Sequence, residues 1–319
     1  MSDKAQILVI KSTPRVDVLR TTSLLKPLRE RYPAGNIIWA VSRRSKVILR
    51  DNPLIDEILP LEDAGTLAVI LNTRFEAVYN FNSTLVSCSA ANLARSPNKL
   101  GFFADEYGSI RAFDESARLL DIGSDKLGVS YQRALYLTAG FENAAIEEMI
   151  FSVSNRAKDC AKTFLAENHL KTGSKPIVLI CQGKSAFNVE SRYPARKVSF
   201  LAEQLTDELN ANVILFSDLA GKETHERAFA GCPPGVINGG CCGHLQRFSA
   251  LISLSDLVIT GDSIGLNIAL ALGKKAVVLT GVNERRDLEL YNRGKRITAS
   301  EGIETITPET IVETVRELL

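Results

Sequence analysis

The chain has 319 residues, which corresponds to about two domains of roughly 150 residues each. Lysine and arginine number 38 and aspartate and glutamate 37, so the net charge is +1, and 45% of the residues are apolar. These values exclude a disordered chain and argue against a general nucleic-acid binder, which carries a marked basic excess. The sequence has neither an apolar run long enough to span a bilayer nor the apolar core of a signal peptide, so we expect a cytoplasmic protein.

The six cysteines are too few for a disulfide framework, and we expect reduced thiols. Cys232, Cys241, Cys242 and His244 lie close together in the sequence, which raises the alternative of a zinc or iron site. They contain no C-x-x-C pair, and two adjacent cysteines cannot easily face one metal ion. We therefore favour loop thiols and predict no metal site.

The first half of the chain alternates between strand and helix patterns. An apolar run at 7–10 predicts a buried strand, and a turn-rich loop follows it. A helical pattern then extends over 17–31, where we expect Pro27 to kink the helix or to end its first part. The other predicted elements of this half are strands at 36–41, 56–59 and 77–81 and helices at 45–51 and 66–72.

The same alternation restarts after the turn-rich segment 171–176, which we interpret as a linker. Alternating elements of this length predict βαβ units and a parallel sheet that is buried on both faces. We therefore predict an α/β fold with two doubly wound parallel-sheet domains, 1–172 and 173–319, facing a cleft. The predicted elements of the second half are strands at 177–181, 212–216, 235–238, 257–260 and 276–280 and helices at 155–172, 198–210, 224–230, 245–254, 265–272 and 309–319.

Ligands of such sheets bind in loops at the carboxyl ends of the strands. No G-x-G-x-x-G follows the first strand, and no P-loop or G-x-S-x-G motif is present, so a dinucleotide site, a P-loop NTPase and the usual hydrolase elbow are not indicated. Asp17, at the start of the first helix, is open to two interpretations. It is either a general base in the cleft or the N-cap of that helix.

Two loops of the second half are candidates for binding an anion. The turn 260–265 joins a strand to a helix, and its backbone N–H groups with the Ser263 hydroxyl could hold a diphosphate, while Asp262 would orient the loop or a sugar hydroxyl. The alternative is an ordinary capped turn. Lys184 or Arg192, after the strand 177–181, could pair with phosphate, and the alternative there is a solvated loop.

Several motifs, in order along nearly the whole chain, resemble glycosyltransferase family 9, the heptosyltransferases of lipopolysaccharide core synthesis. The resemblance is carried by Ile7–Lys11, Asp17–Leu19, Thr22, Leu25, Leu28–Pro33, Ala77–Phe81, Lys99–Phe102, Arg192–Pro194, Val236–Asn238, Ala250–Ile252, Asp256–Ser263 and Ala269–Lys274.

The resemblance implies a GT-B fold, in which two Rossmann-like domains face a cleft. It also implies an inverting transfer that needs no metal and no other cofactor, with the acceptor on the N-terminal domain and the nucleotide-sugar on the C-terminal domain. The family's proposed base corresponds to Asp17. The donor-binding positions correspond to Ser12, Thr13, Glu223, Asp262, Ser263 and Asn267, with Lys184 or Arg192 as the cation and Glu226 as the less favoured alternative to Glu223.

Four positions depart from the family pattern. Val16 replaces a glycine before the base, and Ser191 replaces a phosphate-binding lysine. Ile264 occupies the glycine position after Asp-Ser, and Asn267 replaces a histidine and cannot be cationic. These changes leave an alternative: a catalytically degenerate member that binds a nucleotide-sugar or glycan, or that partners an active transferase.

The resemblance implies ADP-heptose as donor and a bacterial surface glycan, or its lipid-linked precursor, as acceptor. Basic residues of the first half, which we expect to be exposed, could attract anionic lipid or phosphorylated sugar at the cytoplasmic face of the inner membrane, and the alternative is ordinary solvated charge. A nucleotide-sugar epimerase of similar fold is disfavoured, because that class usually needs extra carboxylates and histidines in the cleft and the chain has only three histidines. The basic residues are Arg15, Arg20, Arg43, Arg44 and Lys46.

Overall fold

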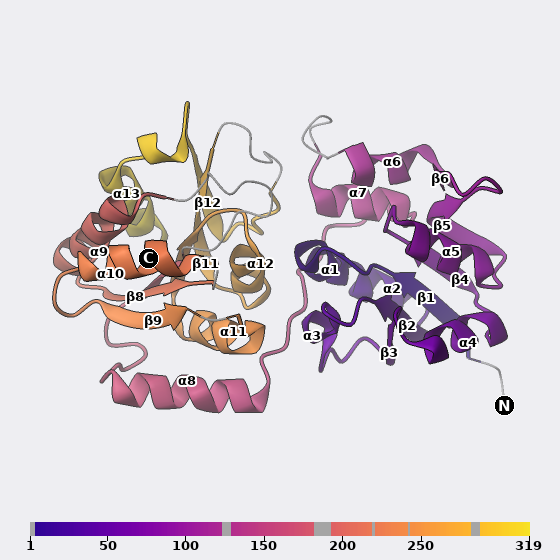
Figure 1. Cartoon of the computed structure of the whole chain (residues 1–319), viewed down its shortest axis with the longest axis horizontal. Helices are drawn as coiled ribbons and strands as arrows, with labels where there is room; N and C mark the ends of the chain where they lie inside the picture. The colour runs from indigo at the N-terminus through magenta and orange to yellow at the C-terminus, as the bar shows by residue number, and fades with distance from the viewer. Residues whose placement is uncertain (1–3, 123–128, 182–192, 219–220, 242, 282–287) are drawn as a thin grey trace. The chain divides into compact units, whose positions relative to one another are not determined.

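The computed structural model describes residues 4–122, 129–181, 193–218, 221–241, 243–281 and 288–319. The chain divides after Ser152 into two compact α/β units, and nearly all of the sequence from Val153 belongs to the second (Figure 1). Each unit is built on one six-stranded sheet with helices on both faces.

The first unit has the strand order β3-β2-β1-β4-β5-β6, parallel except for the antiparallel edge strand β6. Because β1 lies between β2 and β4, the chain reverses its direction of travel across the sheet at β1. The elements are β1 (Gln6–Ile10), α1 (Arg15–Thr21), the 3-10 turn η1 (Thr22–Leu24), α2 (Leu25–Arg31), β2 (Asn36–Val41), α3 (Lys46–Leu49), β3 (Glu57–Pro60), α4 (Ala64–Asn72), β4 (Ala77–Asn80), α5 (Leu85–Leu93), β5 (Asn98–Ala104), β6 (Ile110–Ala112), α6 (Glu115–Ile122) and α7 (Tyr131–Thr138).

The second unit has the order β12-β11-β10-β7-β8-β9, which is the same order of strands counted from its own first strand, β7. All of its strand pairs are parallel. The elements are α8 (Asn155–Glu167), β7 (Ile177–Cys181), α9 (Ala195–Leu209), β8 (Asn212–Ser217), α10 (Lys222–Ala230), β9 (Ile237–Cys241), α11 (Leu245–Leu254), β10 (Leu257–Thr260), α12 (Ile264–Ala271), β11 (Lys275–Thr280), β12 (Gly294–Thr298), the 3-10 turn η4 (Ile303–Thr305) and α13 (Pro308–Leu318).

Alternate residues of the central strands supply the cores. In the first unit, Leu8 and Ile10 of β1 pack with Ile70 of α4 and Ala91 of α5. In the second, strands β7, β8, β10 and β11 pack against α9 and α13. Burial of both sheet faces explains why the central strands are continuous apolar runs in the sequence.

The helix predicted over 17–31 is divided, but at η1 and not at Pro27. The hydroxyls of Thr21, Thr22 and Ser23 donate to the carbonyls of Asp17, Leu19 and Arg20 at 2.6–2.9 Å, and this competes with regular helical hydrogen bonding. Pro27 lies in the first turn of α2, where a missing N–H costs nothing.

The division after Ser152 precedes the domain boundary that the sequence predicts at 172/173. Helix α8 packs on α11, and the backbone N–H of Ser154 donates to Oε1 of Gln246 at 2.9 Å. These contacts place α8 with the second unit, so the turn around Gly173 precedes β7 inside that unit. None of the described helices is long and apolar enough to cross a membrane.

Candidate functional site

The loops after β1 and β4 meet at the point where the strand order of the first sheet reverses. In doubly wound sheets this is the position at which ligands bind. The loop after β1 carries the predicted residues Ser12 and Thr13 and leads into α1, which carries Asp17. The loop after β4 carries Asn82, to which sequence analysis gave no role.

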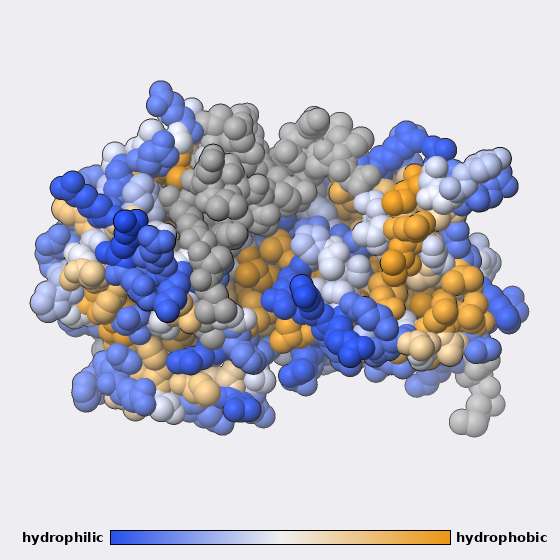
Figure 2. Space-filling model, in the orientation of Figure 1, coloured by the Kyte–Doolittle hydropathy of each residue, from blue (hydrophilic) through white to orange (hydrophobic). Residues whose placement is uncertain are grey.

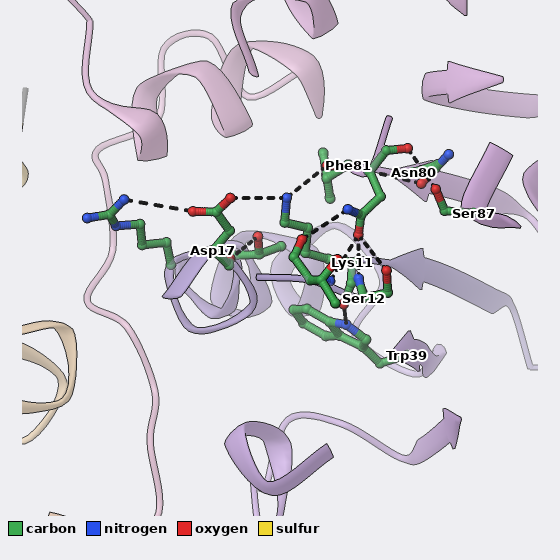
Figure 3. A network of polar contacts seen from close by, with 11 residues as sticks. Lys11, Ser12, Asp17, Trp39, Asn80, Phe81 and Ser87 are labelled. Atoms are coloured by element: carbon green, nitrogen blue, oxygen red, sulfur yellow. Dashed lines mark hydrogen bonds and ion pairs between the residues drawn. The ribbon is translucent and has the colours of Figure 1, made fainter. Parts of the chain in front are cut away.

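The side-chain amide of Asn82 holds the β1 loop, which carries Ser12 (labelled in Figure 3). Its Oδ1 accepts hydrogen bonds from the backbone N–H of Ser12, from Ser12 Oγ at 3.0 Å and from the Thr13 N–H at 3.4 Å. Its Nδ2 donates to the Thr13 carbonyl at 3.0 Å. The Asn82 N–H in turn donates to Oδ1 of Asn80 at 3.1 Å. The Ser12 hydroxyl therefore forms a hydrogen bond inside the protein, whereas Thr13 is exposed to solvent.

Lys11 joins this loop to the helix that follows. Its Nζ donates to the Phe81 carbonyl at 3.1 Å and lies 3.5 Å from Oδ2 of Asp17. Its carbonyl accepts a hydrogen bond from Nε1 of Trp39 at 3.1 Å. Lys11 is 4% exposed, and charged groups at this depth are found paired.

Asp17 is the third residue of α1, whose N-cap is Pro14, so the N-cap interpretation of Asp17 is wrong. Its carboxylate lies between two cations, with Oδ1 3.8 Å from Nη1 of Arg20 and Oδ2 next to Lys11. Oδ1 accepts no hydrogen bond from the described residues. A buried carboxylate with one oxygen open in this way has the chemistry of a proton acceptor.

Helix α7 places an aromatic ring beside the same cations. The Lys11 Nζ lies 5.4 Å and the Arg20 guanidinium carbon 5.8 Å from the centre of the Tyr131 ring. Both distances are within the range of a cation–π contact. The two cations next to the Asp17 carboxylate, Lys11 and Arg20, therefore both also contact the Tyr131 ring of α7.

The second sheet reverses between β7 and β10, and the loop after β10 carries Asp262 and Ser263. Ser263 is the N-cap of α12: its Oγ accepts from the N–H groups of Gly265 at 3.1 Å and Leu266 at 3.4 Å. The Thr260 hydroxyl lies 3.1 Å from the same oxygen. Ser263 is 2% exposed, so its side chain acts as a helix cap.

Asn267, the predicted replacement for a histidine, lies one turn into α12. Its Nδ2 donates to the Ser263 carbonyl at 2.8 Å, and the residue is 2% exposed. Asp262 is also buried. The structure therefore brings Asp262, Ser263 and Asn267 together at the start of one helix, where two of the three side chains stabilise the turn.

The remaining predicted donor residues are Glu223, Lys184 and Arg192. Glu223 is on the exposed face of α10 and forms an ion pair with Arg227 four residues on, at 3.6 Å. Lys184 and Arg192 fall in 182–192, outside the described residues.

The described cysteines do not gather into a metal site. Among the described residues, no group of three or more histidine, cysteine, aspartate or glutamate side chains could hold a metal ion. No disulfide joins two of the described cysteines. Burial raises the pKa of the Cys232 and Cys241 thiols, which favours the protonated form over a thiolate ligand.

Two residues of the site were available to sequence reasoning but were given no role. Lys11 ends the first apolar strand, and Asn82 follows the strand predicted at 77–81. Because β1 and β4 are neighbours, both residues lie at the same sheet edge. The signal that could have found them is a polar side chain directly after each of two buried strands.

Comparisons with known proteins agree with this fold. The family model described as "Glycosyltransferase family 9 (heptosyltransferase)" matches residues 68–311, which is more than half of the chain. A curated relative, lipopolysaccharide heptosyltransferase 1 of Campylobacter coli, is 24% identical, with 98% of each chain covered.

Two solved structures are similar over nearly their whole length. A glycosyltransferase family 9 protein from Veillonella parvula has a TM-score of 0.83 at 15% identity, with 99% of this chain and 97% of that chain covered. The ADP-heptose lipopolysaccharide heptosyltransferase II of Escherichia coli has a TM-score of 0.74 at 20% identity, with 98% of each covered. Two parallel-sheet α/β units and these neighbours confirm the predicted GT-B fold. With its family model matched over most of its length, the chain belongs to glycosyltransferase family 9.

Proposed function

We propose that this family 9 glycosyltransferase is an inverting enzyme that transfers a heptose-like sugar from ADP-heptose to a lipopolysaccharide core or related surface glycan. The observation that carries the proposal is Asp17, a buried carboxylate held between Lys11 and Arg20 at the reversal point of the first sheet. The names of the relatives support this donor and class of acceptor, and the GT-B fold supports a nucleotide-sugar reaction.

In the proposed reaction, Asp17 accepts the proton of an acceptor hydroxyl as that oxygen attacks the anomeric carbon of the donor sugar. The bond from the anomeric carbon to the diphosphate breaks, and ADP leaves on the opposite side, so the anomeric configuration is inverted. An ionised carboxylate within hydrogen-bond reach of the hydroxyl is what this step requires. Lys11 holds Oδ2, and Oδ1 has no hydrogen-bond donor among the described residues, which makes Oδ1 the proposed acceptor of the proton.

The donor diphosphate requires hydrogen-bond donors and positive charge. We assign the exposed Thr13 hydroxyl to the phosphate side of the β1 loop, with Ser12 holding that loop through Asn82. In the second unit, Ser263 and Asn267 shape the β10 loop, Asp262 orients a sugar hydroxyl and Glu223 contacts the nucleotide. Because Asn267 is neutral, Lys184 or Arg192 supplies the cation, and transfer needs no metal ion.

The test is release of ADP from ADP-heptose in the presence of a deacylated core oligosaccharide. Asp17→Asn keeps the shape of the side chain but removes the base, and we expect turnover to fall by at least about a hundredfold, with ADP affinity unchanged. The matched control is Asp63→Asn, a half-buried aspartate of the same unit in an ion pair with Arg43. Unchanged turnover in Asp17→Asn would refute the base assignment.

The catalytically degenerate alternative makes a different prediction for the wild-type chain. It predicts a thermal shift with a nucleotide or nucleotide-sugar but no turnover of any activated sugar. A panel of ADP, UDP, GDP, CDP and dTDP with their sugars identifies the donor, since a ligand at 100 times its Kd stabilises by about 2.7 kcal/mol. Activity that survives EDTA would support the metal-independent mechanism, and activity restored only by an added divalent ion would refute it.

A further inference from the structure

The Tyr131 ring lies beside the proposed base, and no step of the proposed reaction uses it. Tyr131 is the first residue of α7, a helix that packs against α1 and η1. Farther along α7, the Tyr136 hydroxyl donates to the Ser23 carbonyl of η1 at 2.8 Å and accepts the Glu147 N–H at 2.8 Å. These bonds hold α7 on η1, so the position of the Tyr131 ring is set from outside the loop and helix that carry the base.

Tyr131 belongs to a buried group of four side chains, Lys11, Asp17, Arg20 and Tyr131, which we call the base cluster. Hydrophilic and apolar residues lie side by side on the face of the first unit in Figure 2, but the base cluster adds little to that surface, because its members are 3–7% exposed. The expectation that Arg20 lies at the surface is therefore wrong. Little water screens charges at this depth, which strengthens the contacts among a carboxylate, its cations and an aromatic ring.

Arg20 lies beside the Asp17 carboxylate without forming a hydrogen bond to it. Its Nη1 is 3.8 Å from Oδ1, whereas an arginine that bonds a carboxylate does so at about 2.7–2.9 Å. Arg20 follows Asp17 by three residues on the same helix, so the shorter distance is within reach of its side chain. The guanidinium carbon of Arg20 is also 5.8 Å from the centre of the Tyr131 ring, which attracts it in another direction.

The same ring contacts the cation on the other carboxylate oxygen. The Lys11 Nζ is 5.4 Å from the ring centre and 3.5 Å from Oδ2 of Asp17, and it donates to the Phe81 carbonyl at 3.1 Å. Tyr131 is therefore the one side chain of the base cluster other than Asp17 that contacts both cations. This places the ring where it can set how closely each cation approaches the carboxylate.

We infer that Tyr131 is a positioning residue, whose ring holds the Arg20 guanidinium back from Oδ1 of Asp17 and so keeps that oxygen open to an acceptor hydroxyl. The inference rests on the proposed function, in which Oδ1 accepts the proton. A proton acceptor needs a lone pair directed at the hydroxyl, and an arginine N–H bonded to Oδ1 would occupy it. Tyr131 acts through Arg20 and not on the substrate.

Fluorination of the ring tests this contact with little change in the size of the side chain. Fluorine withdraws electrons from the ring face and so weakens its attraction for a cation. The series is Tyr131→Phe, followed by 4-fluoro-, 3,5-difluoro- and 3,4,5-trifluorophenylalanine at the same position of the full chain. The assay is ADP release from ADP-heptose with the deacylated core oligosaccharide.

We expect kcat of Tyr131→Phe to stay within about twofold of the wild type, because the ring is kept, and kcat to fall by about tenfold from there to the trifluoro variant. The KM for ADP-heptose should not change. A kcat that is the same throughout the series would overturn the inference. A series that raises KM at constant kcat would show that the ring contacts the substrate, and would overturn it as well.

The matched control is the same set of fluorinated phenylalanines at position 136. Tyr136 is a buried tyrosine of the same helix, and no cation of the described residues lies over its ring. Loss of its hydroxyl changes the starting value, but kcat should then be constant from Tyr136→Phe to the trifluoro variant. An equal fall at both positions would show that fluorine disturbs the packing of α7, and would overturn the inference.

The position of Arg20 can be followed without any turnover. In the nitrogen-15-labelled full chain, the Arg20 Nε–H resonance is identified as the one that Arg20→Lys removes. Tyr131→Leu should move this resonance downfield, because the ring current is lost and the guanidinium bonds Oδ1. Adding Asp17→Asn to that variant should reverse part of the shift. A resonance that Tyr131→Leu leaves in place would overturn the inference.

Sugar transfer and the position of Arg20 can fail separately. A chain that turns over no activated sugar, but whose Arg20 resonance moves in both variants as described, refutes the proposed function and supports the contact of Tyr131 with Arg20. A chain that transfers sugar at the same kcat throughout the fluorinated series, with an unmoved Arg20 resonance in Tyr131→Leu, refutes the positioning role alone.

Discussion

Replacing Asn82 by alanine removes the group that holds the β1 loop. Four hydrogen bonds are lost, three accepted by Oδ1 and one donated by Nδ2. The two from Ser12 are buried, and their donors are left without a partner, whereas the groups of exposed Thr13 can turn to water. At about 1 kcal/mol for a net hydrogen bond, and more for an orphaned buried donor, we expect a loss of about 2–4 kcal/mol.

The loss of stability can be measured by the fluorescence of the single tryptophan, Trp39. Trp39 is fully buried in β2, and its Nε1 donates to the Lys11 carbonyl, so its fluorescence follows both unfolding of the first unit and the conformation of the loop. A loss of 3 kcal/mol lowers the midpoint of thermal unfolding by about 6–12 °C for a domain of 150–250 residues. Urea titration followed at Trp39 gives the free energy of unfolding directly.

The matched control is Asn98→Ala. Asn98 is an exposed asparagine of the same unit whose Nδ2 donates once, to the Glu76 carbonyl at 3.1 Å. Its replacement should change stability by less than about 0.5 kcal/mol. If Asn82→Ala and Asn98→Ala unfold at the same urea concentration, the loop does not depend on the Asn82 amide, and the reasoning from these four bonds is wrong. Under the proposed mechanism, Asn82→Ala should also lower turnover, because Lys11 and Thr13 lie in the loop that it releases.

Three further predictions concern other parts of the fold. Gly101→Ala should destabilise the first unit by several kcal/mol, because φ is +92° and an added Cβ would lie 1.9 Å from the Asn80 carbonyl oxygen. The control Gly108→Ala, at φ +78° with open space around it, should cost only about 1–2 kcal/mol. Equal urea midpoints for the two variants would refute the close approach at Gly101. Ser263→Ala removes the cap of α12 and should cost about 1–2 kcal/mol in urea unfolding followed by circular dichroism; no loss would show that the cap is dispensable. Burial raises the pKa of the Tyr193 hydroxyl in the folded chain. The contribution of Tyr193 to the free energy of unfolding is therefore fully present below the ordinary pKa near 10. It is lost as pH rises from there through the raised pKa, because the unfolded chain loses the proton first. Between about pH 10 and 12 the wild type should therefore lose up to about 1.4 kcal/mol per pH unit more than Tyr193→Phe, and parallel pH profiles would contradict this sign.

The sequence predicted the strands and helices that carry a strong apolar pattern. The predicted strand 177–181 and helix 245–254 coincide with β7 and α11, because each is a compact apolar segment between turn residues. Helix α5 was not predicted. Its sequence, LVSCSAANL, has small and polar residues without a clear period, and its start is fixed by a capping box between Thr84 and Ser87, where serine takes the place of the usual glutamate.

The reversal of each sheet at its first strand is a tertiary property that no single segment contains. A pattern of alternating strands and helices predicts that strands are parallel, but it does not say that β4 returns to the free side of β1. That return places Asn82 against Ser12, which is 70 residues away in the chain. Sequence reasoning could therefore place Asp17 and Ser12 near a strand end, and it could have singled out Asn82 as a polar residue after a strand, but it could not show that the Asn82 amide bonds Ser12 and Thr13.

Asp17 and Ser263 show why residue type and position alone left two interpretations open. Each lies near the start of a helix after a parallel strand, where a short polar side chain can either cap the helix or bind a ligand. The Ser263 oxygen accepts the N–H groups of its own helix, so its hydrogen-bonding capacity serves the fold. The Asp17 oxygens instead face Lys11 and Arg20, and α1 begins at Pro14 without a side-chain cap. The helix does not need this carboxylate as a cap, and burying it together with two cations costs desolvation free energy. This is why we propose that Asp17 acts on a substrate and is not there for stability.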